Sequence, residues 1–321
     1  MIVVAVVSAK GGVGKSTMAA NLAVALSRHA RAVLAVDLDP QNALHLHFGG
    51  QPQDIAGLSR ASVGGTAWGE VVTRAASGVR VLPFGQINEV DLPTLERRIA
   101  DDPHWLSTQL RSLDLPADAV VILDTPPGVS HTLRQALAVA DRVISVVLAD
   151  AASYATLPQI ENLIRRHYGA KPGSVESVCI VNQVDATSRL SREALQLIEG
   201  VPGMRVLGRV RADRSVSEAL AHGQTVVESA QDSVGRQDLL QCAEQVLQLL
   251  PAPGQQAPEA TADAEAPVET QPEPTVVLGD EDRRPQGQAA PKSRKAGVYR
   301  LMAALLCAAL VLLIVLWIRT R

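Results

Sequence analysis

The residues best suited to chemistry lie together near the N-terminus, in the glycine-rich segment 9–17 with the sequence AKGGVGKST. This segment follows the apolar run 2–7 and precedes a helical pattern, which is the context of a phosphate-binding loop. Glycines let backbone N–H groups surround phosphate oxygens, and a helix N-terminus favours negative charge. We therefore predict a phosphate site built from Gly11, Gly12, Val13, Gly14, Lys15, Ser16 and Thr17.

Each polar side chain of the loop has an expected role. Lys15 would reach the β- and γ-phosphates of a nucleotide, Ser16 would bind Mg²⁺ through its hydroxyl, and Thr17 would donate to the α-phosphate. Lysine is rare in this chain: the first 250 residues contain only Lys10, Lys15 and Lys171. Because two of these lysines fall in one loop, the loop needs compact positive charges that arginine does not supply.

Two further segments place carboxylates directly after apolar runs. Asp37 and Asp39 lie in VDLDPQN, residues 36–42, and Asp124 lies in VVILDTPPG, residues 120–128. Carboxylates at strand ends could hold Mg²⁺ or its bound waters, so Ser16, Asp39 and Asp124 are the predicted metal-site residues. Taken alone, each acidic segment is also compatible with a turn or a helix start capped by aspartate.

The elements that must position these residues alternate between short apolar runs and longer helical patterns. This alternation predicts a doubly wound, mostly parallel α/β sheet over residues 1–250, with ligands at the carboxyl ends of the strands. The expected strands cover residues 2–7, 32–37, 79–83, 119–124, 142–148, 177–181 and 205–210. The expected helices cover residues 16–28, 130–140, 154–166, 189–199, 215–222 and 237–249.

Composition excludes several other classes of protein. The net charge of −3 gives no overall reason to expect nucleic-acid binding. Cys179, Cys242 and Cys307 lie far apart, which argues against a disulfide framework or an iron–sulfur site. His45 and His47 are better explained by an amphipathic segment than by zinc binding.

The C-terminal part of the chain has a different character. Residues 251–298 are rich in Pro, Ala, Gln and Glu, which predicts a disordered linker. Residues 301–318 form an uncharged apolar run with Tyr299 and Trp317 near its ends and basic residues on both sides. This pattern predicts a transmembrane tail anchor over residues 299–321, with the large domain on the cytoplasmic side. A hydrophobic helix that docks on a partner is the alternative.

The three motifs together resemble the MinD/ParA group of ATPases, whose modified Walker A loop has the form KGGVGKST. In that family the extra lysine reaches across a nucleotide-sandwiched dimer, so the resemblance implies that Lys10 contacts the phosphates of a partner copy. It implies that Lys10, Lys15 and Asp39 are catalytic and that Asp39 and Asp124 belong to the two switch segments near Mg²⁺. It also implies that Asn182, in VNQVD, binds the adenine of ATP, although a structural asparagine at a strand end is the alternative.

Finer features resemble the cellulose biosynthesis protein BcsQ branch of this group. They are the segments LHLHFG at 44–49 and VLPFGQ at 81–86, and a helix start near Trp105. This resemblance implies a dimerising ATPase that acts with cellulose synthase or its accessory proteins at the bacterial inner membrane, and at a cell pole in many relatives.

Three other functions share the nucleotide motifs. A DNA-partitioning ATPase would need a basic patch, for which Arg205, Arg209, Arg211 and Arg214 are the candidates, but a membrane tail argues against it. A membrane-positioning ATPase of the MinD kind would use a reversible amphipathic tail instead of a uniformly apolar one. A scaffold that binds ATP without relevant hydrolysis is the third alternative.

Overall fold

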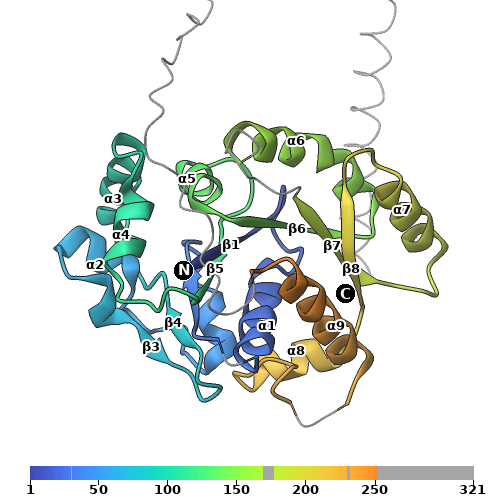
Figure 1. Ribbon diagram of the computed structural model, residues 1–321, viewed down its shortest axis with the longest axis horizontal. Helices are drawn as coiled ribbons and strands as arrows, with labels where there is room; N and C mark the ends of the chain where they lie inside the picture. Colours follow the sequence, from blue (N-terminus) through green and yellow to red (C-terminus); the bar gives the residue numbers. More distant parts are fainter. Residues whose placement is uncertain (30, 169–176, 230–231, 252–321) are drawn as a thin grey trace, which may run out of the picture. The chain divides into compact units, whose positions relative to one another are not determined.

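The computed structural model describes residues 1–29, 31–168, 177–229 and 232–251, which contain one eight-stranded sheet (Figure 1). The strand order is β3-β4-β2-β5-β1-β6-β7-β8. Neighbouring strands are parallel except for the β3–β4 pair, which confirms the predicted mostly parallel sheet. The strands are β1 (Ile2–Val7), β2 (Val33–Asp37), β3 (Thr73–Arg74), β4 (Arg80–Leu82), β5 (Val120–Asp124), β6 (Arg142–Leu148), β7 (Val178–Val184) and β8 (Arg205–Arg211).

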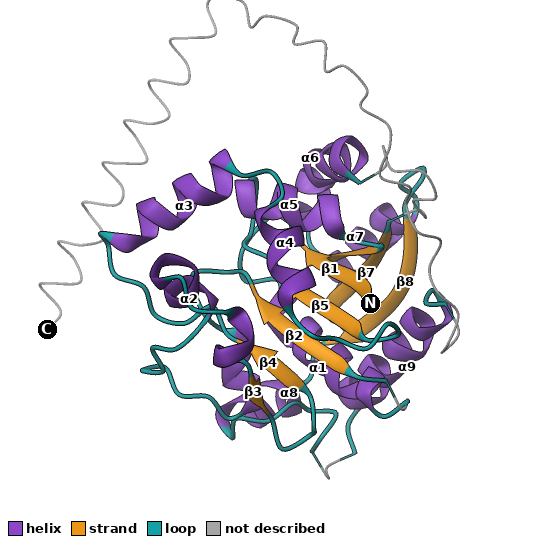
Figure 2. Cartoon of the chain, turned by 60° about the vertical axis from the view of Figure 1, so that its left-hand side comes forward, coloured by secondary structure: helices purple, strands orange, loops and turns teal. Residues whose placement is uncertain are grey.

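Helices cover both faces of this sheet. Helices α1, α8 and α9 lie on one face, and α4, α5 and α6 lie on the other (Figures 1 and 2). The helices are α1 (Lys15–Ser27), α2 (Leu58–Gly64), α3 (Asp91–Asp101), α4 (Trp105–Ser112), α5 (His131–Val139), α6 (Ala151–His167), α7 (Arg189–Glu199), α8 (Arg214–Ala221) and α9 (Val234–Gln248). Two short 3₁₀ helices, η1 (Leu44–Phe48) and η2 (Trp68–Val71), follow β2 and α2.

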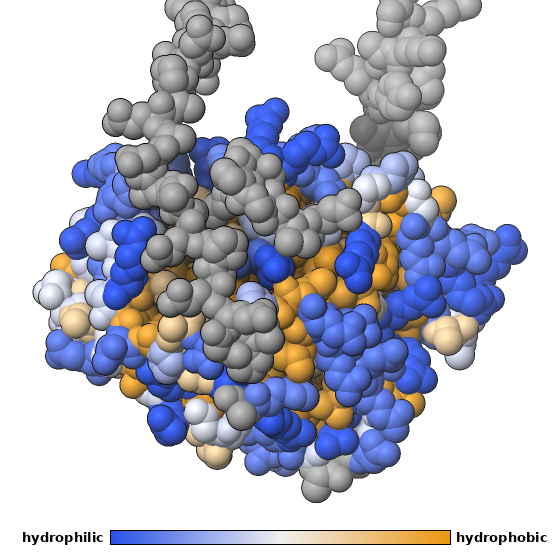
Figure 3. Space-filling model, viewed as in Figure 1, coloured by the Kyte–Doolittle hydropathy of each residue, from blue (hydrophilic) through white to orange (hydrophobic). Residues whose placement is uncertain are grey.

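The central strands do not alternate between apolar and polar residues, because the hydrophobic core covers both of their faces. Along β1, Ile2, Val4 and Val6 pack into the cluster that contains α1 and α9, whereas Val3 and the residues that alternate with it pack toward the opposite face. A parallel strand covered by helices on both sides must be apolar at every position. In Figure 3, hydrophobic residues show between hydrophilic side chains over the middle of the face seen in Figure 1.

The sequence did not predict α2, α3 or β3, and it gave only the start of α4. Neither Val90 nor His104, the residues that cap α3 and α4, supplies a capping side chain. The amides of Val90 and Asp91 donate instead to Oδ1 of Asn88, and the His104 amide donates to Asp102. Tertiary packing adds to this, since the rings of Trp68 and Trp105 meet edge to face with centroids 5.3 Å apart. Such long-range packing has no local sequence signal.

No helix within the described ranges is both long enough and apolar enough to cross a membrane. The predicted tail anchor, residues 299–321, and nearly all of the predicted linker lie outside those ranges. The predicted boundaries near residues 250 and 298 therefore stay predictions.

Candidate nucleotide-binding site

The glycine-rich loop joins β1 to α1 and leaves the start of α1 open. Helices α5, α6, α7, α8 and α9 each have a capping side chain that accepts a backbone N–H bond, but α1 is preceded by Gly14 and has no such cap. The first turn of α1 also lacks an acidic residue. Its free N–H groups and the positive end of its dipole are therefore available to an anion.

Gly14 and Asn182 fit against each other at the start of this helix. Gly14 has φ 89°, and a Cβ atom added there would lie 2.4 Å from Nδ2 of Asn182. The buried Asn182 amide donates from Nδ2 to the Val13 carbonyl at 2.8 Å. This bond supports the loop from β7 and leaves the amide oxygen of Asn182 to accept a further hydrogen bond.

Asn182 lies within β7 and not in a turn after a strand, so the predicted end of this strand at residue 181 is wrong. The positive φ of 54° at Gln183 and a register shift after Val181 let the strand continue to Val184 while the side chain of Asn182 points to the loop. The adenine contact expected of Asn182 stays a prediction.

Two carboxylates meet at the carboxyl ends of β2 and β5. Asp37 and Asp124 are register partners in the parallel ladder, and both are fully buried. Asp37 accepts N–H bonds from Asp39 at 3.0 Å and Leu44 at 2.9 Å, so it fixes the loop after β2. Burial and the Asp124 charge raise the pKa of Asp37 well above its ordinary value.

Asp124 accepts fewer hydrogen bonds than Asp37. Neither of its carboxylate oxygens has a partner within hydrogen-bonding geometry among the described residues, although the Ser16 hydroxyl is near enough to lower the pKa of Asp124. Burial raises the pKa of Asp124 to about 6, although the nearby Lys15 and Ser16 act in the opposite direction. A buried carboxylate without hydrogen bonds is costly, and the nearby Lys15 charge offsets this cost only in part, because the pKa of Asp124 stays raised.

This observation fits Mg²⁺ as part of the site. Asp39 is buried as well, and one of its oxygens accepts from the Gln41 amide at 3.0 Å. Within the ranges that the structure describes, no group of three or more His, Cys, Asp or Glu side chains is arranged to hold a metal ion. Bound Mg²⁺ would therefore need ligands from a nucleotide as well as from Ser16 and the carboxylates, which is usual for Mg²⁺ at phosphate sites.

The loop after β5 contacts the phosphate loop directly. The Gly128 amide donates to the Ser8 carbonyl at 3.2 Å, and the Thr125 hydroxyl donates to the Val6 carbonyl at 2.8 Å. The Leu38 amide, after β2, donates to the Asp124 carbonyl at 2.8 Å. The three predicted motifs thus lie in one site and are joined by hydrogen bonds.

Lys10 is held by a residue that the sequence did not single out. Its ammonium lies 3.0 and 3.2 Å from the two carboxylate oxygens of Asp150, the residue that caps α6. Burial raises the pKa of Asp150, but the Ser153 amide and Lys10 outweigh this effect and hold it below its ordinary value. Both side chains are partly exposed, so the pair contributes little to stability and Lys10 can leave it.

A cavity of about 650 Å³ lies beside the phosphate loop. One side is formed by Gly14 and Thr17 together with Asn182, and the other by the segment 210–214 and by α8. Its volume is within the range of cavities that hold small ligands. Because it opens next to the start of α1, a nucleoside whose phosphates occupy the loop could fill it.

Comparison with known families agrees with this geometry. The family model described as cellulose biosynthesis protein BcsQ matches residues 1–247. The chain belongs to the BcsQ family. Among BcsQ relatives, the cellulose biosynthesis protein BcsQ of Escherichia coli K12 is 27% identical over 254 residues, which cover 76% of this chain and 93% of that protein.

Two other proteins place this BcsQ-family chain among nucleotide-binding folds. An uncharacterised ATP-binding protein of Methanocaldococcus jannaschii is 29% identical over 250 residues, covering 77% of this chain and 88% of that protein. The septum site-determining protein MinD from Pyrococcus horikoshii, solved with Mg-ADP, superposes with a TM-score of 0.62 at 24% identity, covering 77% of this chain and 96% of that chain. This chain therefore has a MinD-like P-loop NTPase fold.

The candidate DNA patch of this BcsQ-family chain is partly neutralised. Of its four arginines, Arg209 forms an ion pair with Glu199, and Arg211 forms one with Asp238 at 2.7 Å. An arginine whose charge is paired within the protein releases fewer counterions on binding a nucleic-acid phosphate. The structure gives no independent support for a DNA-binding surface at this edge of the sheet.

His47 is a site residue that sequence reasoning missed. It lies in η1, is 3% exposed, and its Nε2 is 3.4 Å from the Thr17 hydroxyl. Burial lowers the pKa of His47 to about 4, so the imidazole is neutral at pH 7. The only available signal was the alternation in LHLHF, which reveals a buried side chain but not the loop that it contacts.

The buried His47 predicts an acid-sensitive fold. Between pH 6.5 and about 4 the unfolded state binds a proton on His47 that the folded state does not, so stability rises with pH across this window. Going from pH 7 to pH 5, His47 should cost about 2 kcal/mol of the free energy of unfolding, and His47→Gln should remove that part of the loss. Urea denaturation of both proteins at both pH values measures the difference, with the exposed His29→Gln as the control. An equal loss in the original chain and in His47→Gln would contradict this prediction.

Proposed function

We propose that this chain is a switch ATPase that binds ATP and Mg²⁺, dimerises in the ATP state and hydrolyses ATP slowly. The observation that supports this proposal most is the uncapped start of α1, where buried Lys15 lies near the unpartnered carboxylate of Asp124. This site combines open anion-binding N–H groups with a buried carboxylate whose oxygens have no hydrogen-bond partner among the described residues. An Mg²⁺–triphosphate group satisfies both at once.

Each residue then has a defined task. The glycine loop, Lys15 and Thr17 would bind the triphosphate, and Ser16 and Asp124 would hold Mg²⁺, which neutralises phosphate charge when bound. Asp39 would orient the attacking water, and the amide oxygen of Asn182 would accept from the amino group of adenine. Lys10 would leave Asp150 and contact the phosphates of the partner copy, which links ATP to dimerisation.

The biological role rests on the family. A relative named cellulose biosynthesis protein BcsQ supports a role in cellulose synthesis or secretion, with the cellulose synthase complex or an accessory protein as the partner. The apolar run at residues 301–318 supports attachment of a cytoplasmic ATPase to the bacterial inner membrane, and a polar position is part of the same proposal.

Phosphate release from ATP in the presence of Mg²⁺ tests the enzymatic part of this proposal. The unmodified chain should release phosphate, whereas Asp39→Ala should bind ATP and release at least tenfold less, because the water would lose its orienting carboxylate. Asp54→Ala, which removes an exposed carboxylate from the same part of the chain, is the matched control. ATP binding with no hydrolysis by the unmodified chain would favour the scaffold alternative.

A further inference from the structure

We propose that Asp238 and Asp213 are positioning residues for the nucleoside side of the site: they fasten the segment 211–213 to the start of α9 and so fix one wall of the cavity. This inference rests on the proposed ATP binding and extends it to residues outside the motifs. The segment in question follows β8 and leads into α8, and Arg211, Ala212 and Asp213 all line the cavity of about 650 Å³.

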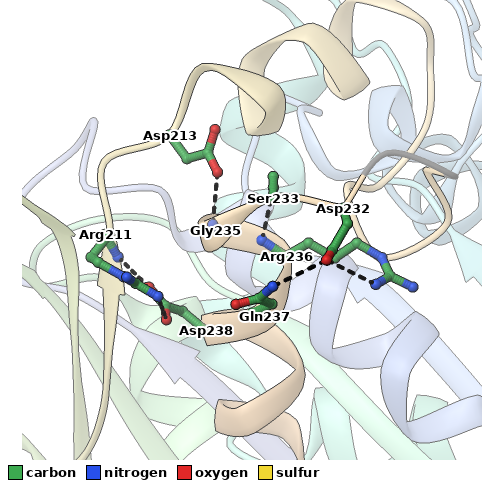
Figure 4. Close-up of polar contacts among 8 residues, drawn as sticks. All are labelled: Arg211, Asp213, Asp232, Ser233, Gly235, Arg236, Gln237 and Asp238. Atoms are coloured by element: carbon green, nitrogen blue, oxygen red, sulfur yellow. Dashed lines mark hydrogen bonds and ion pairs between the residues drawn. The ribbon is translucent and has the colours of Figure 1, made fainter.

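Asp238 holds one end of this wall through three hydrogen bonds. Its Oδ2 accepts from the backbone amide of Arg211 at 2.9 Å and from Nε at 2.8 Å, and its Oδ1 accepts from Nη2 at 2.7 Å (Figure 4). Two parallel bonds from a guanidinium fix its orientation as well as its position. The Asp238 side chain is 11% exposed and the Arg211 side chain is 46% exposed, so the carboxylate is shielded from water while one side of the guanidinium faces solvent.

Asp213 holds the other end. Its Oδ2 accepts from the Gly235 amide at 2.7 Å, at the start of α9 (Figure 4). Its Oδ1 accepts from the Ser215 amide at 2.9 Å, at the start of α8. Burial raises the pKa of Asp213, but these amides outweigh it and bring the value to about 2. One carboxylate thus joins the first turns of two helices.

The approach of α9 depends on Gly235. A Cβ atom at this position would lie 2.9 Å from Cβ of Asp213 and 3.1 Å from a methyl group of Val216. Both neighbours line or border the cavity wall, since Val216 is also a lining residue. A larger residue at position 235 would therefore displace this wall, including Asp213, without removing a charge.

Asp238 acts on the cavity only through Arg211. Arg211 lines the nucleoside cavity, whereas Asp238 does not, and instead lines a separate cavity of about 740 Å³ together with Arg211. Without the carboxylate, the guanidinium would be free to turn into the space expected for the base. The phosphate loop, which is held by Asn182 and by the loop after β5, would not be affected.

The test compares a ligand that has a base with one that has none. The 321-residue chain and its Asp238→Asn variant are titrated with ATP and with inorganic tripolyphosphate, both with Mg²⁺, by calorimetry. We expect Asp238→Asn to raise the Kd of ATP about tenfold and to leave the Kd of tripolyphosphate unchanged. Equal weakening of both ligands, or no weakening of either, would overturn the positioning role.

A second variant and a control guard against simple misfolding. Gly235→Ala, which displaces Asp213 without removing a charge, should give the same selective loss of ATP affinity. The control is Glu199→Gln, which breaks the ion pair between Glu199 and Arg209. Arg209 lies in β8, as Arg211 does, and this variant should change neither the Kd of ATP nor that of tripolyphosphate. If the unmodified chain binds tripolyphosphate but binds ATP no tighter, the nucleoside cavity and this inference both fail. If it binds neither ligand, the proposed function itself is overturned, and the positioning role with it.

Discussion

Replacing Lys15 by glutamine should weaken ATP binding by up to about a hundredfold. Lys15 is 6% exposed, so its ammonium meets the phosphates in a site from which most water is excluded. A charge-assisted contact of this kind contributes up to about 3 kcal/mol, which corresponds to roughly a hundredfold in Kd. Equilibrium dialysis with labelled ATP and Mg²⁺ measures the change directly.

The control for this variant is Lys171→Gln, which removes a lysine that is distant from the loop along the sequence. Thermal melting without nucleotide checks that Lys15→Gln still folds. A folded Lys15→Gln chain that binds ATP within a few fold of the original would show that this loop is not the phosphate site. In that case Asn182 and the adjoining cavity would have to serve another ligand.

Replacing Lys10 by alanine should remove ATP-dependent dimerisation and leave ATP binding nearly unchanged. The Lys10 ammonium is paired with Asp150 at the start of α6. In the proposed function Lys10 leaves this pair for the phosphates of another copy, so its loss should remove a contact between copies and not one within the protomer. Sedimentation velocity with Mg²⁺ and a non-hydrolysable ATP analogue should give a dimer for the original chain and a monomer for Lys10→Ala.

Asp150 both caps α6 and pairs with Lys10, and Asp150→Asn separates these two roles. Asparagine caps a helix about as well as aspartate, so α6 keeps its start while Lys10 loses its partner. We expect this variant to dimerise at least as tightly as the original, because Lys10 no longer has to leave a carboxylate. An ATP-induced dimer of Lys10→Ala would contradict the role of this lysine, whatever Asp150→Asn does.

Much of the fold could be predicted because its signals are local. The apolar runs of β1 and β5 reflect burial on both faces of a parallel sheet, and the glycines before Lys15 reflect a loop that must curve tightly. Both signals span only a few residues. Helices with a capping serine, such as α5 and α7, were also located within a residue or so.

The sequence by itself determined the class of fold and the phosphate loop, since these depend on periodicity and on glycine spacing. Only the tertiary structure decided which distant residues complete the site. Asp124 pairs with Asp37 because β5 lies beside β2, and Asn182 supports the loop because the fold brings β7 next to the Val13 carbonyl. Strand order and register are set by the packing of the whole sheet, and no short stretch of sequence contains that information.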